Sequence, residues 1–223
     1  CGPVPRGRWM LACACALIGA AILPAHALAH PGYDASIHAA SEEVAAHPHD
    51  RAVRLKRVEL YRRAGHLHDA LSDLRVLARE DPNDPAMLVE RALVRIAQGR
   101  SRAAERDLDA AIALGSTSIT ARWERAKLLE RAGRLDEARD DLDAAIALGG
   151  TPDLYLDLAR VHAARGDLDA AARTLAAGCD ALSDAVVLRL RLVQVHRERD
   201  RPAEALAELD GLLDRAPGRA DWV

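Results

Sequence analysis

The peptide DLDAAIALG occurs twice in this chain, at residues 107–115 and again at residues 141–149, at an offset of 34 residues. An identical stretch at a fixed offset indicates an internal repeat, in which each copy is one structural unit. Asp107 and Asp109 are two residues apart, so on a helix they point to different faces and do not form a carboxylate pair for acid–base chemistry. The duplicated peptide therefore predicts repeated architecture and no duplicated active site.

The same period runs through most of the chain in four columns of residues. The reference column is Gly65, Gly99, Gly133, Gly166 and then Asp200. Nine residues later stand Leu74, Leu108, Leu142, Leu175 and Leu209. Five residues after the reference stand Ala70, Ala104, Ala138, Ala171 and Ala205, and seven before it Val58, Ala92, Ala126, Ala159 and Val193. Pro48, Pro82 and Pro217 mark one end of the unit.

Each unit reads as two amphipathic helices. The segment ARWERAKLLERAG, residues 121–133, has apolar residues at helical spacing and ends at Gly133, a residue that readily terminates a helix. The segment RLDEARDDLDAAIALG, residues 134–149, gives the second helix and ends at Gly149. One such pair cannot bury its own apolar face, whereas a stack of pairs can.

This pattern resembles the tetratricopeptide repeat. The resemblance implies an all-α, right-handed superhelical solenoid of antiparallel helix pairs. Five repeats are expected at 51–84, 85–118, 119–151, 152–185 and 186–217, after a half repeat at 30–50 and before a tail at 218–223. The chain departs from the family at the aromatic position early in the first helix, which holds Arg54, Leu88, Arg122, Tyr155 and Arg189.

Charged residues placed symmetrically about the turn predict ion pairs within units. Antiparallel helices that meet at the reference glycine bring residues eight before it and eight after it side by side. The expected pairs are Arg57–Asp73, Arg91–Asp107 and Arg125–Asp141. In the fourth unit both positions change together, to Leu158 and Thr174. Asp109 and Asp143 are expected to be solvated.

The first 29 residues have the pattern of a secretory signal peptide. Arg6 and Arg8 precede an apolar run at 9–23, and Ala27-Leu-Ala29 forms a small-residue cleavage site. The run is shorter than the about 20 residues that a spanning helix needs, so no stable membrane insertion is expected after cleavage. We expect an exported, periplasmic protein of a Gram-negative-type bacterium in which Cys179 is the remaining cysteine.

The composition and motifs favour no enzyme and no cofactor. The net charge of −3 gives no argument for nucleic acid. No nucleophile–base pair, Gly-rich phosphate loop or HExxH motif is found. The histidine pairs in 47–50 and 66–69 fall at opposite ends of one helix, so no metal site is expected there. The alternative is a metal-handling or enzyme-accessory protein that uses His30, the new N-terminus after cleavage, and neighbouring histidines.

The resemblance implies a concave groove lined by the first helices, in which a protein or peptide segment binds. The first groove column is Leu55, Val89, Trp123, Leu156 and Leu190. The second is Glu59, Leu93, Lys127, Arg160 and Gln194, and the third Arg62, Ile96, Glu130, Ala163 and Arg197. The Lys and Asn clamp by which some family members hold a carboxylate is missing.

An apolar floor with a mixed-charge rim suits a partner with apolar anchors. Trp123, in the middle repeat, is either the anchor point for that partner or a core residue that fills space left by the missing aromatics. The last helix, within PAEALAELDGLLDRA at 202–216, has an apolar edge. This edge is expected to bind a partner, to bind a second copy, or to be covered by a continuation of the chain.

Overall fold

The computed structural model describes residues 33–183 and 185–214, and this part of the chain forms eleven helices and no strand. The helices are α1 (Asp34–Ala46), α2 (Arg51–Arg63), α3 (Leu67–Glu80), α4 (Pro85–Ala97), α5 (Ser101–Ala113), α6 (Ile119–Arg131), α7 (Leu135–Leu148), α8 (Pro152–Ala164), α9 (Leu168–Ala181), α10 (Val186–Glu198) and α11 (Pro202–Asp214). The expected signal peptide, His30 and the tail at 218–223 lie outside the described residues.

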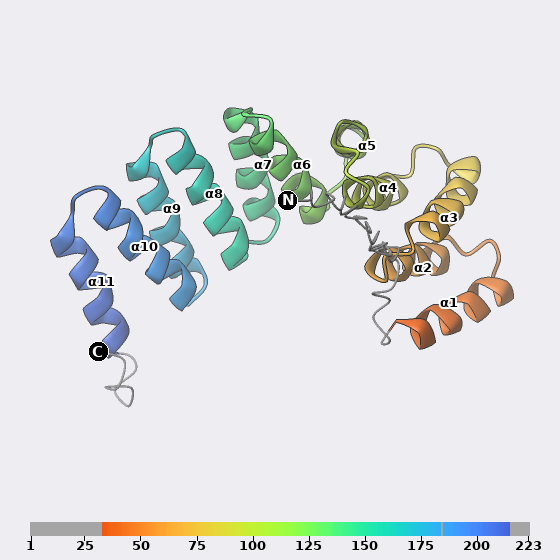
Figure 1. Ribbon diagram of the computed structural model, residues 1–223, viewed down its shortest axis with the longest axis horizontal. Coiled ribbons are helices and arrows are strands. Elements are labelled where there is room, and N and C mark those ends of the chain that lie inside the picture. The colour runs from red at the N-terminus through yellow and green to blue at the C-terminus, as the bar shows by residue number, and fades with distance from the viewer. Residues whose placement is uncertain (1–32, 184, 215–223) are drawn as a thin grey trace, which may run out of the picture.

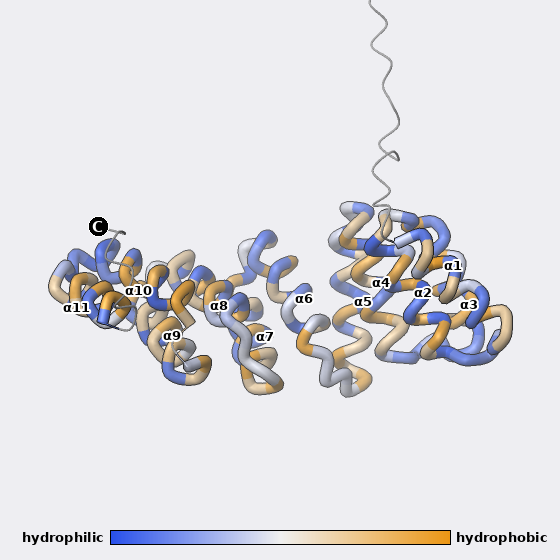
Figure 2. Tube along the Cα trace, turned by 90° about the horizontal axis from the view of Figure 1, so that it is seen from below, coloured by the Kyte–Doolittle hydropathy of each residue, from blue (hydrophilic) through white to orange (hydrophobic). Residues whose placement is uncertain are grey.

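The helices form antiparallel pairs that stack side by side into a right-handed superhelical solenoid (Figure 1). The pairs are α2–α3, α4–α5, α6–α7, α8–α9 and α10–α11, and α1 lies alone at one end, in contact with α2. Hydrophilic and hydrophobic residues are both present in the helices (Figure 2), as expected for helices that bury one side against their neighbours. The first helix of each pair begins at the first residue of the corresponding unit, at 51, 85, 119, 152 and 186.

Short signals in the sequence fix where the helices end and begin. Gly65, Gly99, Gly133 and Gly166 all have φ between 72° and 81°, which residues with a Cβ rarely adopt. Asp200 takes the same left-handed conformation at φ 56°, and aspartate is one of the few non-glycine residues that visit it. The first helices of four units begin at side chains that accept hydrogen bonds from free backbone N–H groups, namely Asp50, Asp84, Ser118 and Thr151.

The two copies of DLDAAIALG end differently although their letters are the same. In the first copy, α5 stops at Ala113 and Gly115 takes φ 84°. In the second copy, α7 continues to Leu148 and Gly149 has an extended backbone with φ 168°. The linker that follows is residues 114–118 in the first case and the shorter 149–151 in the second. The third unit, 119–151, is one residue shorter than its neighbours, and the deletion is absorbed at this linker.

The repeated leucines and alanines form the core. Leu74, Leu108, Leu142 and Leu175 are at most 1% exposed, because each lies between two units. Leu209 departs from this expectation and is 36% exposed. Among the described helices, α11 packs mainly on α10, so its outer side is not covered by a further helix pair.

Tyr155, near the start of the fourth unit, is packed against Gly150 at the end of the third unit and Gly178 in the fourth. A Cβ added at Gly178 in α9 would lie 2.7 Å from Cγ of Tyr155 and 2.7 Å from Cδ1 of Leu188. A Cβ at Gly150 would lie 2.9 Å from Cε2 of the same ring. Gly178 stands where the second and third units have Ala111 and Ala145, so the missing methyl makes room for the tyrosine.

Gly178→Ala is expected to lower the free energy of unfolding by about 1–3 kcal/mol through overpacking, which outweighs the helix-propensity gain of about 1 kcal/mol. Urea denaturation followed by circular dichroism measures the change. Tyr155→Leu should relieve the clash, so the double variant is expected to lose less than the sum of the two single variants. A neutral or stabilising Gly178→Ala in the presence of Tyr155 would contradict this account.

Candidate functional site

Three buried aspartates each receive two parallel hydrogen bonds from one arginine of the preceding helix. Asp73, Asp107 and Asp141 are 5%, 4% and 2% exposed. In each pair the arginine donates one hydrogen bond from Nε and one from Nη2. The two distances are 2.7 and 2.7 Å for Arg57–Asp73 and 3.0 and 2.7 Å for Arg91–Asp107. For Arg125–Asp141 they are 2.6 and 2.6 Å. These are the three pairs that symmetry about the turn predicts. The fork geometry strengthens each pair, and the Asp141 hydrogen bonds raise the pKa of Arg125.

Each of these aspartates also contacts a second arginine, which sequence reasoning missed. Arg54 Nη1 lies 3.0 Å from Asp73, Arg122 Nη1 lies 3.5 Å from Asp141, and Arg95 bonds Asp107. Arg54 and Arg122 occupy the position where the family has an aromatic residue. The sequence contains a signal for this second arginine. In the fourth unit, where Thr174 replaces the aspartate, the aromatic position holds Tyr155 in place of an arginine.

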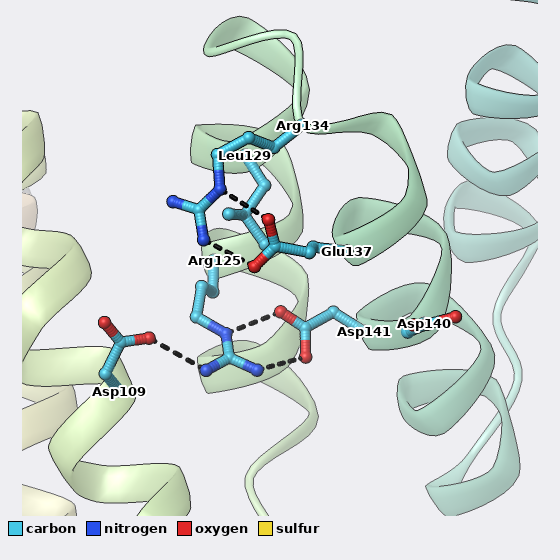
Figure 3. Close-up of a pocket in the computed structure, with 7 residues that line it drawn as sticks. All are labelled: Asp109, Arg125, Leu129, Arg134, Glu137, Asp140 and Asp141. Atoms are coloured by element: carbon cyan, nitrogen blue, oxygen red, sulfur yellow. Dashed lines mark hydrogen bonds and ion pairs between the residues drawn. The ribbon is translucent and has the colours of Figure 1, made fainter. Parts of the chain in front are cut away.

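Asp109 and Asp143, the second aspartates of the two copies, have different environments. Asp109 is solvated, as expected, with its side chain 52% exposed, and it also accepts a hydrogen bond of 2.8 Å from Nη1 of Arg125 (Figure 3). Arg125 therefore joins its own unit to the preceding one. Asp143 has no ion-pair partner within 33–183 and 185–214, because Leu158 stands where the next unit would supply the arginine.

Asp141→Ala is expected to destabilise the protein by about 3–5 kcal/mol, because it leaves the half-buried charges of Arg125 and Arg122 without their partner. Thermal and urea unfolding measure the loss. The matched control is the double variant Arg125→Leu/Asp141→Thr, which gives two positions their fourth-unit residues. It removes the charge of Arg125 together with its partner and leaves only Arg122 unpaired, so it should cost less than Asp141→Ala. The account fails if the double variant is the less stable of the two.

The side chains of the first groove column differ in their exposure along the concave face. Val89 is 7% exposed and belongs to the core as well as to the groove floor, whereas Leu190 is 48% exposed. Leu55, Trp123 and Leu156 are half-buried. In the second column Glu59, Leu93 and Lys127 are half-buried, and Arg160 and Gln194 are exposed. The floor is thus deepest near α2 and α4.

A hollow of ≈ 730 Å³ opens at that deep end, and we name it the α2–α4 hollow. Of the expected groove residues it brings together Leu55, Glu59 and Val89. Sequence reasoning missed the rest of its lining, which is Lys56, Asp84, Pro85, Ala86, Glu90 and the loop residues Gly115, Ser116, Thr117 and Ser118. The loop belongs to the second unit and α2 to the first, so only the stacking of units brings the loop close to Leu55.

Trp123 lies between two units and is engaged on its edge and on its face. Its Nε1 donates a hydrogen bond of 2.6 Å to Oδ2 of Asp157 in α8. The Lys127 ammonium lies 4.6 Å from the ring centroid, within the range of a cation–π contact. The ring also packs against the core cluster that includes Leu129 and Leu142. Trp123 therefore holds α6 to α8, and these contacts leave less of its ring available to a partner.

The described residues contain no group of three or more His, Cys, Asp or Glu side chains that could hold a metal ion. His47 and His49 precede α2, and His66 and His68 follow it, so the helix separates the two pairs. None of the helices in the described ranges has the length and apolar character to cross a membrane.

A stack of antiparallel helix pairs with a concave face of first helices defines an α-solenoid repeat protein. The family model described as tetratricopeptide repeat matches residues 26–85, 89–154 and 156–220, and the chain belongs to this family. No curated protein sequence matches the chain.

Solved structures of tetratricopeptide repeat proteins share the fold. MamA residues 41–end from Desulfovibrio magneticus RS-1 is 16% identical, with a TM-score of 0.62 over 76% of this chain and 96% of that one. TTC0263 of Thermus thermophilus is 20% identical, with a TM-score of 0.59 over 73% and 90%. YrrB, described as having an unusual peptide-binding site, is 16% identical, with a TM-score of 0.62 over 82% and 95%. At these identities the likeness shows the fold alone.

Proposed function

We propose that this protein is a non-catalytic interaction scaffold that binds a protein or peptide segment in its concave groove. The observation that carries the proposal is the α2–α4 hollow, a recess with an apolar floor on the face that the first helices share. Leu55 and Val89 form the floor, and Glu59 and Glu90 stand at its rim. Such a recess suits one apolar side chain of a partner segment, with polar contacts around it. The peptide-binding site named for YrrB is consistent with this kind of role.

The anchor point of the proposed groove is Leu55, in place of the expected Trp123. The edge of the Trp123 ring is occupied by Asp157 and one face by Lys127, so a partner would have to displace these contacts. Leu55 is half-buried, lines the hollow and belongs to the outermost helix pair. Leu55 also packs against the core cluster that includes Val58, so removing it should cost some stability as well as binding. Removing Trp123 should act mainly on stability.

The test uses peptides selected on the immobilised chain from a random phage-displayed library, with affinities measured by fluorescence anisotropy. Leu55→Ser is expected to weaken binding about tenfold or more, because burial of a leucine side chain contributes about 1.5–3 kcal/mol. Leu190→Ser, in the same column at the shallow end of the groove, is the matched control and should change affinity little.

Trp123→Phe is expected to lower the free energy of unfolding by about 1–2 kcal/mol through loss of the hydrogen bond to Asp157, with affinity nearly unchanged. If Trp123→Phe abolishes binding and leaves stability intact, Trp123 is the anchor and the assignment to Leu55 is wrong. If Leu55→Ser binds the selected peptides as tightly as the unmodified chain, the α2–α4 hollow is not the binding site.

We propose export to the periplasm as the setting, supported by the charged, apolar and small-residue segments of residues 1–29. Mass spectrometry of the protein recovered from an expressing Gram-negative host should show a chain that begins at His30 in the periplasmic fraction. Recovery of the chain with residues 1–29 intact from the cytoplasm would contradict export.

A further inference from the structure

Two hollows with opposite charge excess lie along the concave face. The α2–α4 hollow is lined by the carboxylates of Glu59, Asp84 and Glu90 and by a single ammonium group, that of Lys56. A second hollow of ≈ 260 Å³ lies between α6 and α8, and we name it the α6–α8 hollow. Its lining is the reverse, with three cations and one carboxylate, namely Lys127, Arg131, Arg160 and Glu130. The lining side chains of the two hollows therefore differ in the sign of their charge excess. Asp84 is already paired with Arg51, and Lys56 with Glu43, so Glu59 and Glu90 are the carboxylates left to take a further cation.

The carboxylates of the α2–α4 hollow can accept a further cation. Glu59 is 41% exposed and its contact with Arg63, 2.9 Å away and 55% exposed, is a weak surface pair along one helix. Glu90 is more deeply placed, with its side chain 20% exposed and Nε of Arg62 3.1 Å from its carboxylate. Burial raises the pKa of Glu90 even with that arginine beside it, so its carboxylate is poorly solvated and gains from an additional positive charge.

The cations of the α6–α8 hollow leave one charge available to a ligand. Arg160 already bonds Glu130 and Asp157, and Lys127 is held by Glu124 and by the Trp123 ring. Arg131 is exposed at the end of α6, and within the described part of the chain no ion pair engages it. An acidic side chain of a partner can therefore pair with Arg131 without breaking an existing contact.

We infer that the groove selects a bipolar segment, one that carries an apolar anchor, Lys or Arg on the side over the α2–α4 hollow, and Asp or Glu on the side over the α6–α8 hollow. This inference rests on the proposed function and specifies the partner of the same groove. Opposite charges across an interface fix the register of a segment, and the reversed placement brings like charges together. The apolar anchor supplies affinity, and the charges determine which end lies where.

The first test is the composition of the peptides that a random phage-displayed library yields on the immobilised chain. Enriched peptides are expected to carry basic residues on one side of an apolar residue and acidic residues on the other. Their affinity should fall as salt is raised, since the partly exposed pairs are screened. Enrichment of peptides without this polarity overturns the inference and leaves the scaffold function standing, whereas no enrichment at all overturns the scaffold function itself.

The second test reverses the charge of each hollow separately. Glu59→Lys is expected to weaken binding of a selected peptide about tenfold, and a peptide whose basic residues are replaced by Glu should regain that affinity on this variant. Arg131→Glu should do the same with the acidic residues of the peptide replaced by Lys. The matched controls are Glu42→Lys on α1 and Arg106→Glu on α5, which make the same charge changes on exposed residues outside the two hollows.

Circular dichroism and thermal unfolding of each variant show whether the fold is kept. The two hollows are tested by different variants. If one variant fails to fold, the other variant still tests its own hollow. If Glu59→Lys and Arg131→Glu change affinity no more than their controls, or if the charge-exchanged peptides do not restore binding, the bipolar segment is excluded.

Discussion

No helix pair in this chain can bury its own apolar side, and the rest of the structure depends on that constraint. Each pair is stable only when the next pair covers it, so the same small and apolar residues recur at the same spacing. Ala70, Leu74 and their counterparts lie where units meet and are almost fully buried, whereas Leu209, on the last described helix, is more than a third exposed. Stacking in one direction then places all the first helices on one face, which creates the groove.

The buried arginine–aspartate pairs add a second constraint within this stack. A buried carboxylate without a partner is costly, so each of the three aspartates is held by two arginines. The fifth unit keeps a carboxylate, Glu208, paired with Arg189 although Leu192 stands at the position of the fork-bonded arginine. The fourth unit shows the alternative solution, with Leu158, Thr174 and Tyr155 at the three positions. Arg125 extends the network by reaching back to Asp109, so the charges also hold neighbouring units together.

The features that could serve a function lie where the units differ from one another. The buried alanine and leucine columns are nearly uniform, because the same contacts between helices recur in every unit. The groove positions change from Glu59 to Leu93 to Lys127 along a single column. This variation gives the α2–α4 hollow its carboxylates and the α6–α8 hollow its cations. A scaffold of this kind can keep its core pattern and still change its partner by substitution on the concave face.

The sequence by itself determined the helix pairs and the ion pairs Arg57–Asp73, Arg91–Asp107 and Arg125–Asp141. These depend on local spacing and on the symmetry of two antiparallel helices about one turn, so counting residues from Gly65, Gly99 and Gly133 was sufficient. The tertiary structure decided what lies between units. It placed loop residues 115–118 beside Leu55, joined Trp123 to Asp157, and gave Asp109 a partner that Asp143 lacks. The physical reason is that the angle and offset at which one unit packs on the next depend on many side chains at once. These two quantities cannot be derived from a single spacing in the sequence.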